Sequence, residues 1–462
     1  MSPPAWLDAL LTPRSIALVG VSDDPTRVAG RALSFLKRYG YAGDIFPVNT
    51  RVATVQGLPA FKSVAELPCA PSLALISLRA DRIHSAVQAC IERGVDAAII
   101  YASGFAEQDR AGAKLQAELK EMVAASPMRV LGPNCLGAVS SYTGVTATFA
   151  TAFDDGELAP GSVALLTQSG AFASFVYAVG RAAGVGFGFL ATTGNEMDLT
   201  IGELLGGVIE QPQIGSALVH IESIRDVDVF RRAATRAREL HKPLAVIKVG
   251  RSEVGALAAR AHTNADVGSD EEYDPMFDEL GIQRVETMAE LADAGQVFQS
   301  AARPAGRRVT ILSVSGGTGV LMADAAAKAG LDVPELPPDV RGRLDALLQP
   351  FASSRNPVDV TGAVFDDLTT FEQVVKECVT DESTDLVLVA VGNATATEHL
   401  ITEAILTGAQ ASTKPIYVAW VGGSGAPARR LVHAGVPTFD DPTRAVRAAA
   451  FGVRTASADD SR

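Results

Sequence analysis

The run Pro243-Leu-Ala-Val-Ile-Lys-Val249 ends at Gly250 and leads into a stretch of small residues that carries His262. Because the run is short, rich in β-branched residues and closed by glycine, it indicates a buried β-strand. We expect residues 250–270 to form a small-residue loop at the carboxyl end of this strand, where open α/β sheets bind their ligands. His262 is therefore a candidate functional residue, although one histidine among six is, without context, more often structural or exposed.

Similar apolar runs recur along the chain, each followed by a polar or glycine turn and then by a helical stretch. Alternating strands and helices of this kind indicate parallel sheets with right-handed crossovers. At 462 residues, with 47% hydrophobic and 20% charged residues, the chain is long enough for about three such domains. The runs are residues 16–19, 44–49, 73–78, 97–101, 129–131, 162–166, 186–191, 217–221, 243–249, 309–313, 385–391 and 414–420.

We predict an α/β fold built from three domains with parallel sheets. The first domain, residues 1–145, is Rossmann-like. The second, residues 146–302, begins around a polar segment and contains His262. Residues 303–307, Arg-Pro-Ala-Gly-Arg, form a short linker to the third domain, residues 308–456, which repeats the strand-turn-helix pattern of the second.

Composition excludes several classes of protein. A net charge of −13 argues against a general nucleic-acid surface, because phosphate backbones require clustered Lys and Arg. The first residues lack the basic and apolar blocks of a signal peptide, and no charge-free apolar run reaches membrane-spanning length. The four cysteines are scattered without disulfide or metal-ligand spacing, so we expect a cytoplasmic protein without a metal site.

Three glycine-rich turns lie where a strand passes into a helix, and each leaves N–H groups of the helix start open to an anion. They contain Gly20, Ser169 with Gly170, and Gly316 with Gly317. Taken singly, such a turn more often serves tight packing than phosphate binding. No acidic residue closes the second strand to hold the ribose of NAD, and Arg51 lies there instead. The pattern disfavours an NAD-dependent dehydrogenase and favours a phosphate-rich ligand.

Glu222 follows another strand of the sheet that precedes His262, so both side chains could reach one crevice. A carboxylate bonded to one ring nitrogen orients an imidazole and leaves the other nitrogen free as a nucleophile. An equally good interpretation pairs Glu222 with Arg225 on the surface. Three polar residues follow the predicted strand 186–191, and hydrogen bonding within their own turn is a better interpretation of them than a catalytic role. These are Asn195, Glu196 and Asp198.

With these motifs in this order, the chain resembles the NDP-forming acyl-CoA synthetase superfamily, in particular the α subunit of ADP-forming acetate-CoA ligase. Its first two domains also resemble the α subunit of succinyl-CoA synthetase. The likeness runs from about Leu10 to Arg454. It implies a Rossmann-like CoA-binding domain followed by two flavodoxin-like ligase domains of the succinyl-CoA synthetase type.

The resemblance implies a role for each turn. His262 would be the phosphorylated histidine, Glu222 would orient it, and two helix N-termini would hold its phosphoryl group without a metal. Those helix starts are Ser169 with Gly170 and Gly316 with Gly317. The residues implied to bind CoA are Gly20, Val21, Ser22, Arg27, Thr50, Arg51, Ser77, Leu78, Asn134 and Cys135. Ser77 and Leu78 replace a Val-Pro pair that is usual in the family, and Cys135 would line the pantetheine end rather than act as a nucleophile.

The implied reaction joins an acid to CoA with conversion of ATP to ADP and phosphate. In the reverse direction phosphate attacks acyl-CoA, which gives an acyl phosphate and CoA. His262 then takes the phosphoryl group and releases the acid, and a mobile segment of a partner passes the group to the nucleoside diphosphate. The sequence shows no ATP-grasp module, so we expect ATP or ADP with Mg²⁺ on a separate ATP-grasp β subunit of a hetero-oligomer. The small-molecule partner is a small carboxylic acid or its acyl-CoA.

The histidine loop departs from the family pattern. The family usually reads His-Thr-Gly-Ala-Leu-Ala-Gly, whereas this chain reads His262-Thr-Asn-Ala-Asp-Val-Gly268. Asn264 adopts a left-handed conformation at more cost than glycine, and Asp266 adds a negative charge near a phosphate. These departures motivate an alternative function, a catalytically impaired CoA-binding regulatory or scaffold protein of the same fold.

Overall fold

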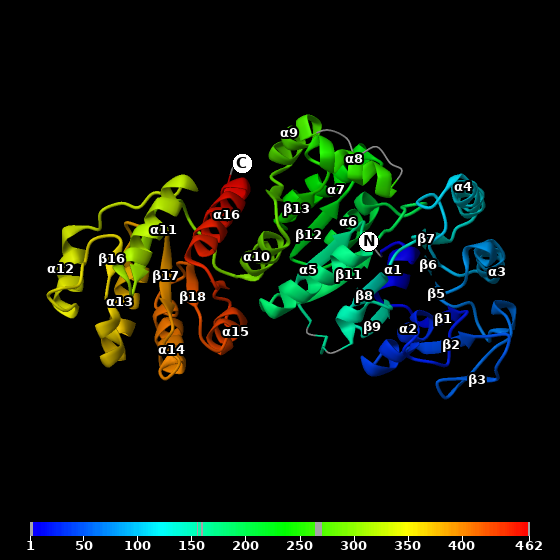
Figure 1. The fold of residues 1–462 in the computed structure, drawn as a ribbon, viewed down its shortest axis with the longest axis horizontal. Helices are drawn as coiled ribbons and strands as arrows, with labels where there is room; N and C mark the ends of the chain where they lie inside the picture. Colours follow the sequence, from blue (N-terminus) through cyan, green and yellow to red (C-terminus); the bar gives the residue numbers. More distant parts are fainter. Residues whose placement is uncertain (1–2, 155, 159, 264–269, 461–462) are drawn as a thin grey trace. The chain divides into compact units, whose positions relative to one another are not determined.

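The computed structural model describes residues 3–154, 156–158, 160–263 and 270–460 (Figure 1). Its secondary structure forms three large sheets of mostly parallel strands, so the predicted α/β class is confirmed. The strands at the centre of each sheet are buried along their whole length, as expected where helices cover both faces of a parallel sheet. No helix among the described residues is long and apolar enough to cross a membrane.

The first sheet has five strands, all parallel, in the order β2-β1-β5-β6-β7. The strands are β1 (Ser15–Val19), β2 (Asp44–Val48), β5 (Leu73–Ile76), β6 (Ala97–Ile100) and β7 (Arg129–Leu131). The helices of this part of the chain are α1 (Ala5–Leu11), α2 (Val28–Arg38), α3 (Ile83–Arg93) and α4 (Arg110–Ala124). A small hairpin, β3 (Thr54–Val55) with β4 (Leu58–Pro59), follows β2.

The second sheet has seven strands in the order β14-β13-β12-β10-β11-β8-β9. Its parallel strands are β10 (Val163–Thr167), β11 (Phe187–Thr192), β12 (Ser216–Ile221), β13 (Leu244–Lys248) and β14 (Gln283–Val285). An antiparallel hairpin, β8 (Gly137–Ser140) and β9 (Val145–Thr148), extends the sheet beyond β11. The helices are α5 (Gly170–Ala182), α6 (Ile201–Ile209), α7 (Val227–Glu239), α8 (Glu253–Thr263) and α9 (Asp270–Leu280).

The third sheet has the order β16-β15-β17-β18-β19 and is parallel throughout. Its strands are β15 (Val309–Ser313), β16 (Val358–Asp359), β17 (Leu386–Gly392), β18 (Ile416–Val421) and β19 (Thr438–Phe439). The helices are α10 (Met288–Gln299), α11 (Gly316–Lys328), α12 (Pro338–Leu347), α13 (Leu368–Thr380), α14 (Glu398–Ala409), α15 (Ala426–His433) and α16 (Pro442–Asp460).

All three sheets share one strand order for their parallel strands. Numbered within each sheet, the order is 2-1-3-4-5, so the second strand lies on one side of the first and the later strands are added on its other side. Ligands of open α/β sheets bind at the carboxyl ends of the strands at such a switch point. The fold therefore offers one candidate site per sheet, after β1 and β5, after β10 and β12, and after β15 and β17.

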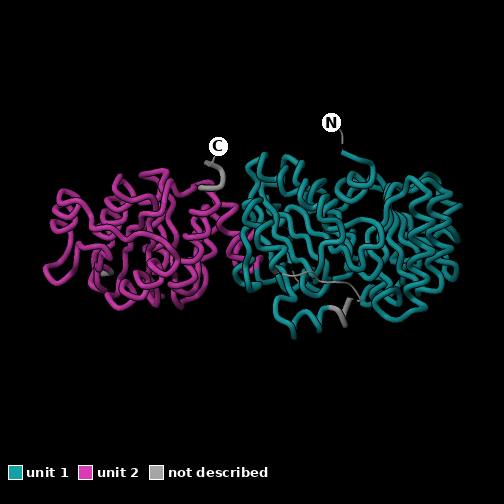
Figure 2. The backbone as a smooth tube through the Cα atoms, turned by 90° about the horizontal axis from the view of Figure 1, so that it is seen from above, with its two compact units in different colours: residues 1–179, 186–291 teal, residues 180–185, 292–462 magenta. Residues whose placement is uncertain are grey.

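The chain divides into two compact units (Figure 2). Unit 1 comprises residues 1–179 and 186–291 and contains the first two sheets. Unit 2 comprises residues 180–185 and 292–462 and contains the third sheet. The residues predicted to bind CoA therefore share a compact unit with Glu222, whereas Gly316 and Gly317 belong to unit 2.

The prediction of a loop over residues 250–270 is wrong for most of that segment, because residues 253–263 form helix α8. Gly250 makes the turn in a left-handed conformation, and the Ser252 hydroxyl accepts a hydrogen bond from Gly255 N at 3.0 Å. The segment that follows is rich in Ala, which has the highest helix propensity. His262 consequently lies in the last turn of α8, while Asn264 and Asp266 lie outside the described residues.

We predict that Arg129→Met destabilises unit 1 by about 3 kcal/mol, because two part-buried carboxylates lose the cation that pairs with both of them. Arg129 binds Asp198 at 2.9 Å and Glu203 at 2.8 Å, and both carboxylates are largely shielded from solvent. The matched control is Arg236→Met, since Arg236 makes similar contacts on an exposed helix face and should cost less than about 1 kcal/mol. Urea unfolding followed by circular dichroism measures both. Equal losses for the two variants would contradict the prediction.

Candidate functional site

The first sheet has a cavity of about 760 Å³ at its switch point. Residues that follow β1, β2 and β5 line it, as expected for a ligand site of a doubly wound sheet. Eight of the ten residues implied to bind CoA lie on this cavity. They are Gly20, Val21, Ser22, Arg27, Thr50, Arg51, Ser77 and Leu78.

Cationic side chains give this cavity its chemical character. Arg27 and Arg51 are joined there by three cations that sequence reasoning missed, Lys62, Arg79 and Arg82. Among the described lining residues there is no Asp or Glu. A chain with a net charge of −13 thus concentrates positive charge at one strand-end cavity, which fits a ligand with several phosphates.

Close packing of the loops after β1 and β5 forms the floor of this cavity. Gly20 has a φ of +83°, and a Cβ at this position would lie 2.8 Å from the Ser77 carbonyl oxygen and 2.5 Å from the Leu78 side chain. A larger residue would therefore push the two loops apart. Asn49 ties in the loop after β2, because its side chain donates to Val21 O at 2.9 Å and accepts from Arg51 N at 2.8 Å.

A second cavity, of about 260 Å³, lies at the switch point of the second sheet. Its wall includes the start of α5, at Ser169 and Gly170, and the turn after β12, at Glu222 and Ser223. The remaining lining residues are Tyr101, Glu107, Asn134, Cys135, Leu136, Phe149, Gln168, Ala171, Gly194, Asn195, Glu196 and Arg225. Two predicted CoA-binding residues, Asn134 and Cys135, thus lie on this cavity rather than on the cation-lined one.

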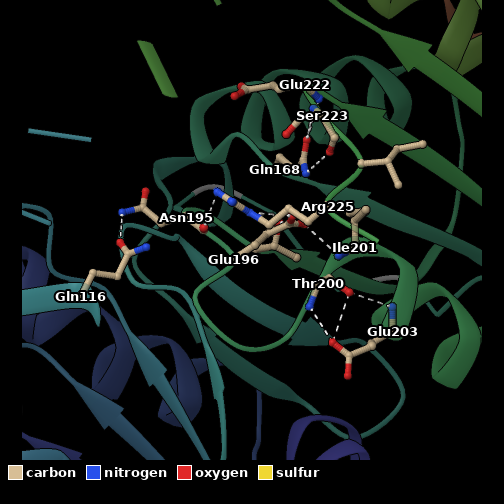
Figure 3. A network of polar contacts seen from close by, with 12 residues as sticks. Gln116, Gln168, Asn195, Glu196, Thr200, Ile201, Glu203, Glu222, Ser223 and Arg225 are labelled. Carbon is tan, nitrogen blue, oxygen red and sulfur yellow. Dashed lines mark hydrogen bonds and ion pairs between the residues drawn. The ribbon is translucent and has the colours of Figure 1, made fainter. Parts of the chain in front are cut away.

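The amide of Gln168 fixes the backbone that carries Glu222 (Figure 3). Its Oε1 accepts hydrogen bonds from Glu222 N at 2.6 Å and Ser223 N at 3.0 Å, and its Nε2 donates to Ser223 O at 2.6 Å. Figure 3 shows the carboxylate of Glu222 directed away from this amide. Gln168, which sequence reasoning did not single out, therefore holds the turn after β12 beside the start of α5.

Arg225 is paired with Glu196, not with Glu222 as one interpretation of the sequence proposed. Arg225 Nε lies 3.5 Å from Glu196 Oε2, and its Nη2 donates to Asn195 O at 3.0 Å (Figure 3). Glu196 Oε1 accepts from Ile201 N at 2.7 Å and from the Thr193 hydroxyl at 3.0 Å. Burial raises the pKa of Glu196, although these hydrogen bonds and Arg225 oppose the shift.

The loop after β11 is held partly by its own turn and partly by the first sheet. Glu196 bonds its own turn as predicted, whereas Asp198 binds Arg129 at 2.9 Å and accepts from Val130 N at 2.7 Å. Asn195 Nδ2 donates to the side chains of Glu107 and Gln116 at 2.5 and 2.9 Å. Asp198 therefore serves packing between the sheets, while Asn195 and Glu196 face the cavity.

Cys135 lies in the turn after β7 and is 2% exposed. Burial raises the pKa of its thiol to about 12, so the sulfur carries its proton at neutral pH. A protonated thiol is a poor nucleophile, which agrees with the expectation that Cys135 lines a site rather than attacks a substrate.

Two glycine-rich helix starts have the same local structure. In unit 1 the Thr167 hydroxyl donates to Ser169 O at 2.7 Å, and α5 begins at Gly170. In unit 2 the Ser313 hydroxyl donates to Ser315 O at 2.8 Å, and α11 begins at Gly316. A Cβ at Gly317 would meet nothing within 4 Å, whereas one at Gly316 would lie 2.9 Å from Asp359 Oδ2, so the α11 start is open at Gly317 and has a carboxylate beside Gly316. The shared phosphate site formed by these two starts around His262 stays a prediction.

Comparison with known proteins assigns each sheet to a domain family. Residues 14–141 match the CoA binding domain, residues 160–298 the succinyl-CoA ligase like flavodoxin domain, and residues 309–425 the Ligase-CoA domain. The fold, the cation-lined cavity and these matches define a CoA-binding protein of the succinyl-CoA ligase type.

The relatives narrow this class. The chain is 30% identical over 451 residues to the alpha subunit of ADP-forming acetate-CoA ligase I of Pyrococcus furiosus, covering 96% of each. It is 31% identical to the alpha subunit of ligase II of the same organism, covering 97% of each. The structure of a dinucleotide forming acetyl-coenzyme A synthetase 1 from Ca. Korarchaeum cryptofilum, in complex with phosphate and ADP, superimposes with a TM-score of 0.91. That chain is 28% identical, with 99% of this chain and 98% of the other covered. The chain belongs to the family of ADP-forming acetate-CoA ligase alpha subunits.

We predict that Arg51→Ala weakens CoA binding about 10-fold or more, because a charge-assisted hydrogen bond to phosphate is lost. Isothermal titration calorimetry of the purified chain with CoA measures the effect. Lys114→Ala is the control, since Lys114 lies on α4 outside the cavity with 79% of its side chain exposed. An unchanged affinity for Arg51→Ala would show that the cation-lined cavity is not the phosphate site.

We predict that Glu196→Gln raises the thermal unfolding midpoint near neutral pH. Burial raises the pKa of Glu196 in the folded chain, so the folded state is favoured by protonation and loses that advantage as pH rises through the folded pKa. The benefit of the neutral amide should therefore grow between pH 4.5 and pH 8. Differential scanning calorimetry across this range measures it. A variant that is destabilised most at high pH would show that attraction to Arg225 outweighs the cost of burial.

Proposed function

We propose that this chain is the CoA-binding, phosphohistidine-carrying α subunit of an NDP-forming acyl-CoA synthetase. The reaction is acid + CoA + ATP = acyl-CoA + ADP + phosphate, and it runs in either direction through an acyl phosphate and phosphorylated His262. One observation carries the proposal. Asn134 and Cys135 follow the last strand of the CoA-binding sheet, yet they line the cavity at the start of α5 in the second sheet.

The residues divide the work between the two cavities. Arg27, Arg51 and their cationic neighbours hold the phosphates of CoA, and the pantetheine arm reaches the second cavity past Asn134 and Cys135. There the thioester meets an anion held by the start of α5. A helix N-terminus favours an anion by roughly 0.3 to 1 kcal/mol, more where it is partly buried.

Arg225 adds the second positive element of the anion site. Its guanidinium lies on the cavity wall with Ser169 and Gly170, and Glu196 and Asn195 O hold it in place. Phosphate attacks the thioester carbon, the C–S bond breaks, and the leaving thiolate takes a proton as CoA departs. A cation and helix N–H groups stabilise the negative charge that develops on the carbonyl oxygen.

His262 then accepts the phosphoryl group, and the acid leaves with the electrons of the broken O–P bond. The carboxylate of Glu222, on the turn clamped by Gln168, accepts the N–H of one imidazole nitrogen while the other nitrogen attacks phosphorus. Gly316 and Gly317, at the start of α11, are proposed as further phosphate-binding residues. Asn264 and Asp266 follow the histidine closely in the sequence. They modulate the rate of the transfer rather than abolish it.

A separate ATP-grasp β subunit completes the enzyme. The relatives named alpha subunits support this partner, and the names of the relatives support ADP as the nucleotide product. ATP or ADP with Mg²⁺ binds that subunit, whose mobile segment carries the phosphoryl group between the nucleotide and His262. The complex works on a small carboxylic acid or its acyl-CoA in the cytoplasm.

We predict that His262→Asn in the complex with the β subunit abolishes acyl-CoA formation, a loss of at least about 10³-fold, because the phosphoryl acceptor is removed. Incubation with ATP labelled in the γ-phosphate should place an acid-labile label on the wild-type α chain and none on the variant. CoA affinity by calorimetry should stay within about 2-fold of wild type.

His399→Asn is the matched control, because His399 is exposed on α14 in unit 2. It should retain both label and activity. A wild-type α chain that takes no label in the complex would favour the scaffold alternative. Joint loss of label and CoA binding in His262→Asn would mean that the histidine serves the fold.

A further inference from the structure

Tyr101 has a buried hydroxyl that none of the described residues satisfies. The residue directly follows β6 at the carboxyl edge of the first sheet, is 7% exposed and lines the 260 Å³ cavity. Its hydroxyl oxygen has no hydrogen-bond partner among the described groups. Buried hydroxyls are nearly always paired, so an unpaired one on a residue that lines a cavity can be satisfied by a group of a bound ligand.

The ring of Tyr101 is held rigidly, so the hydroxyl has a fixed position. Phe149 packs edge-on against it with ring centroids 5.1 Å apart. On another side Gly137 allows close approach, because a Cβ there would lie 3.0 Å from Tyr101 Cε1 and 2.0 Å from Ala147 O. A fixed hydroxyl selects ligands by geometry, because little side-chain entropy is lost on binding.

An apolar wall lies between the start of α5 and Tyr101. Leu136 lies against Gly170, where a Cβ would come within 2.5 Å of Leu136 Cγ, and Cys135 precedes it in the chain. Leu136, Cys135 and Phe149 all line the cavity with Tyr101. A substrate whose carboxyl group lies at the start of α5 therefore extends its carbon chain along Leu136 towards Tyr101.

From this arrangement we infer that Tyr101 is a specificity-determining residue that hydrogen-bonds an oxygen substituent on the acyl chain. The inference rests on the proposed function and names its substrate class, short carboxylic acids with a hydroxyl or carbonyl oxygen on the chain. A site built to bond a substrate oxygen discriminates strongly against the analogue that lacks it, whereas an apolar pocket discriminates weakly against an added hydroxyl.

Matched pairs of acids test the inference in the complex with the ATP-grasp β subunit. The kcat/KM for 3-hydroxypropionate is compared with that for propionate, and 4-hydroxybutyrate with butyrate, by release of ADP in the presence of CoA. Wild type should favour one hydroxy acid by about 10-fold or more. Tyr101→Phe should remove that preference, with the plain acids within about 2-fold of wild type.

Tyr142→Phe is the control, because it removes a tyrosine hydroxyl outside this cavity that bonds Gln213 O at 3.2 Å. It should keep the wild-type preference. CoA affinity by calorimetry verifies that both variants are folded. The preference of the wild-type complex among the acids tests the inference without any variant.

Three outcomes overturn the inference. A wild-type complex that prefers the plain acids, or a Tyr101→Phe variant that slows both members of each pair equally, shows that the hydroxyl does not bind the acyl chain. If the complex is active and labels His262 but gives one of these two results, the proposed function is retained and only this inference is rejected. A wild-type complex that activates no acid and takes no label overturns the proposed function, and this inference with it.

Discussion

Backbone hydrogen bonds between residues 130–133 and 195–199 hold the first two sheets together. Asn195 N donates to Pro133 O at 2.9 Å, and Met197 N donates to Gly132 O at 3.1 Å. Gly194 makes this contact possible, because a Cβ there would lie 2.3 Å from Pro133 O. Since each segment follows the carboxyl end of a strand, the bonds bring two ligand-binding edges into one compact unit. The proposed reaction of a thioester bound at one sheet with a group held at the other depends on this contact.

The fold class could be predicted from the sequence because the central strands of all three sheets are apolar throughout. Short apolar runs ended by glycine or polar residues coincide with central strands such as β1, β10 and β15, and the parallel α/β class is confirmed. These strands are buried on both faces, so they appear in the sequence as unbroken apolar runs. The turns after these strands could be predicted as well, because each apolar run ends at a glycine or a polar residue.

Side-chain partnerships were harder to predict, because they depend on where separate turns meet in space. Arg225 is close to Glu222 in sequence, yet its ion pair is with Glu196 from the turn after β11. Lys62, Arg79 and Arg82 join the cation-lined cavity from segments that carry no glycine-rich motif. Helix α8 was taken for a loop because glycine and small residues near its start obscured an alanine-rich helical stretch. Ser252, a residue type that often caps helices, was the available signal.

The burial of Cys135 has a consequence for side reactions. An acyl phosphate is an activated acyl donor, and any thiolate beside it competes with CoA for the acyl group. The Cys135 sulfur lies on the cavity wall but keeps its proton, with carbonyl oxygens of Ile100 and Leu131 at 3.5 and 3.8 Å. Under the proposed function, the protein thus places a compact, polarisable group next to the reactive intermediate while protecting itself from acylation.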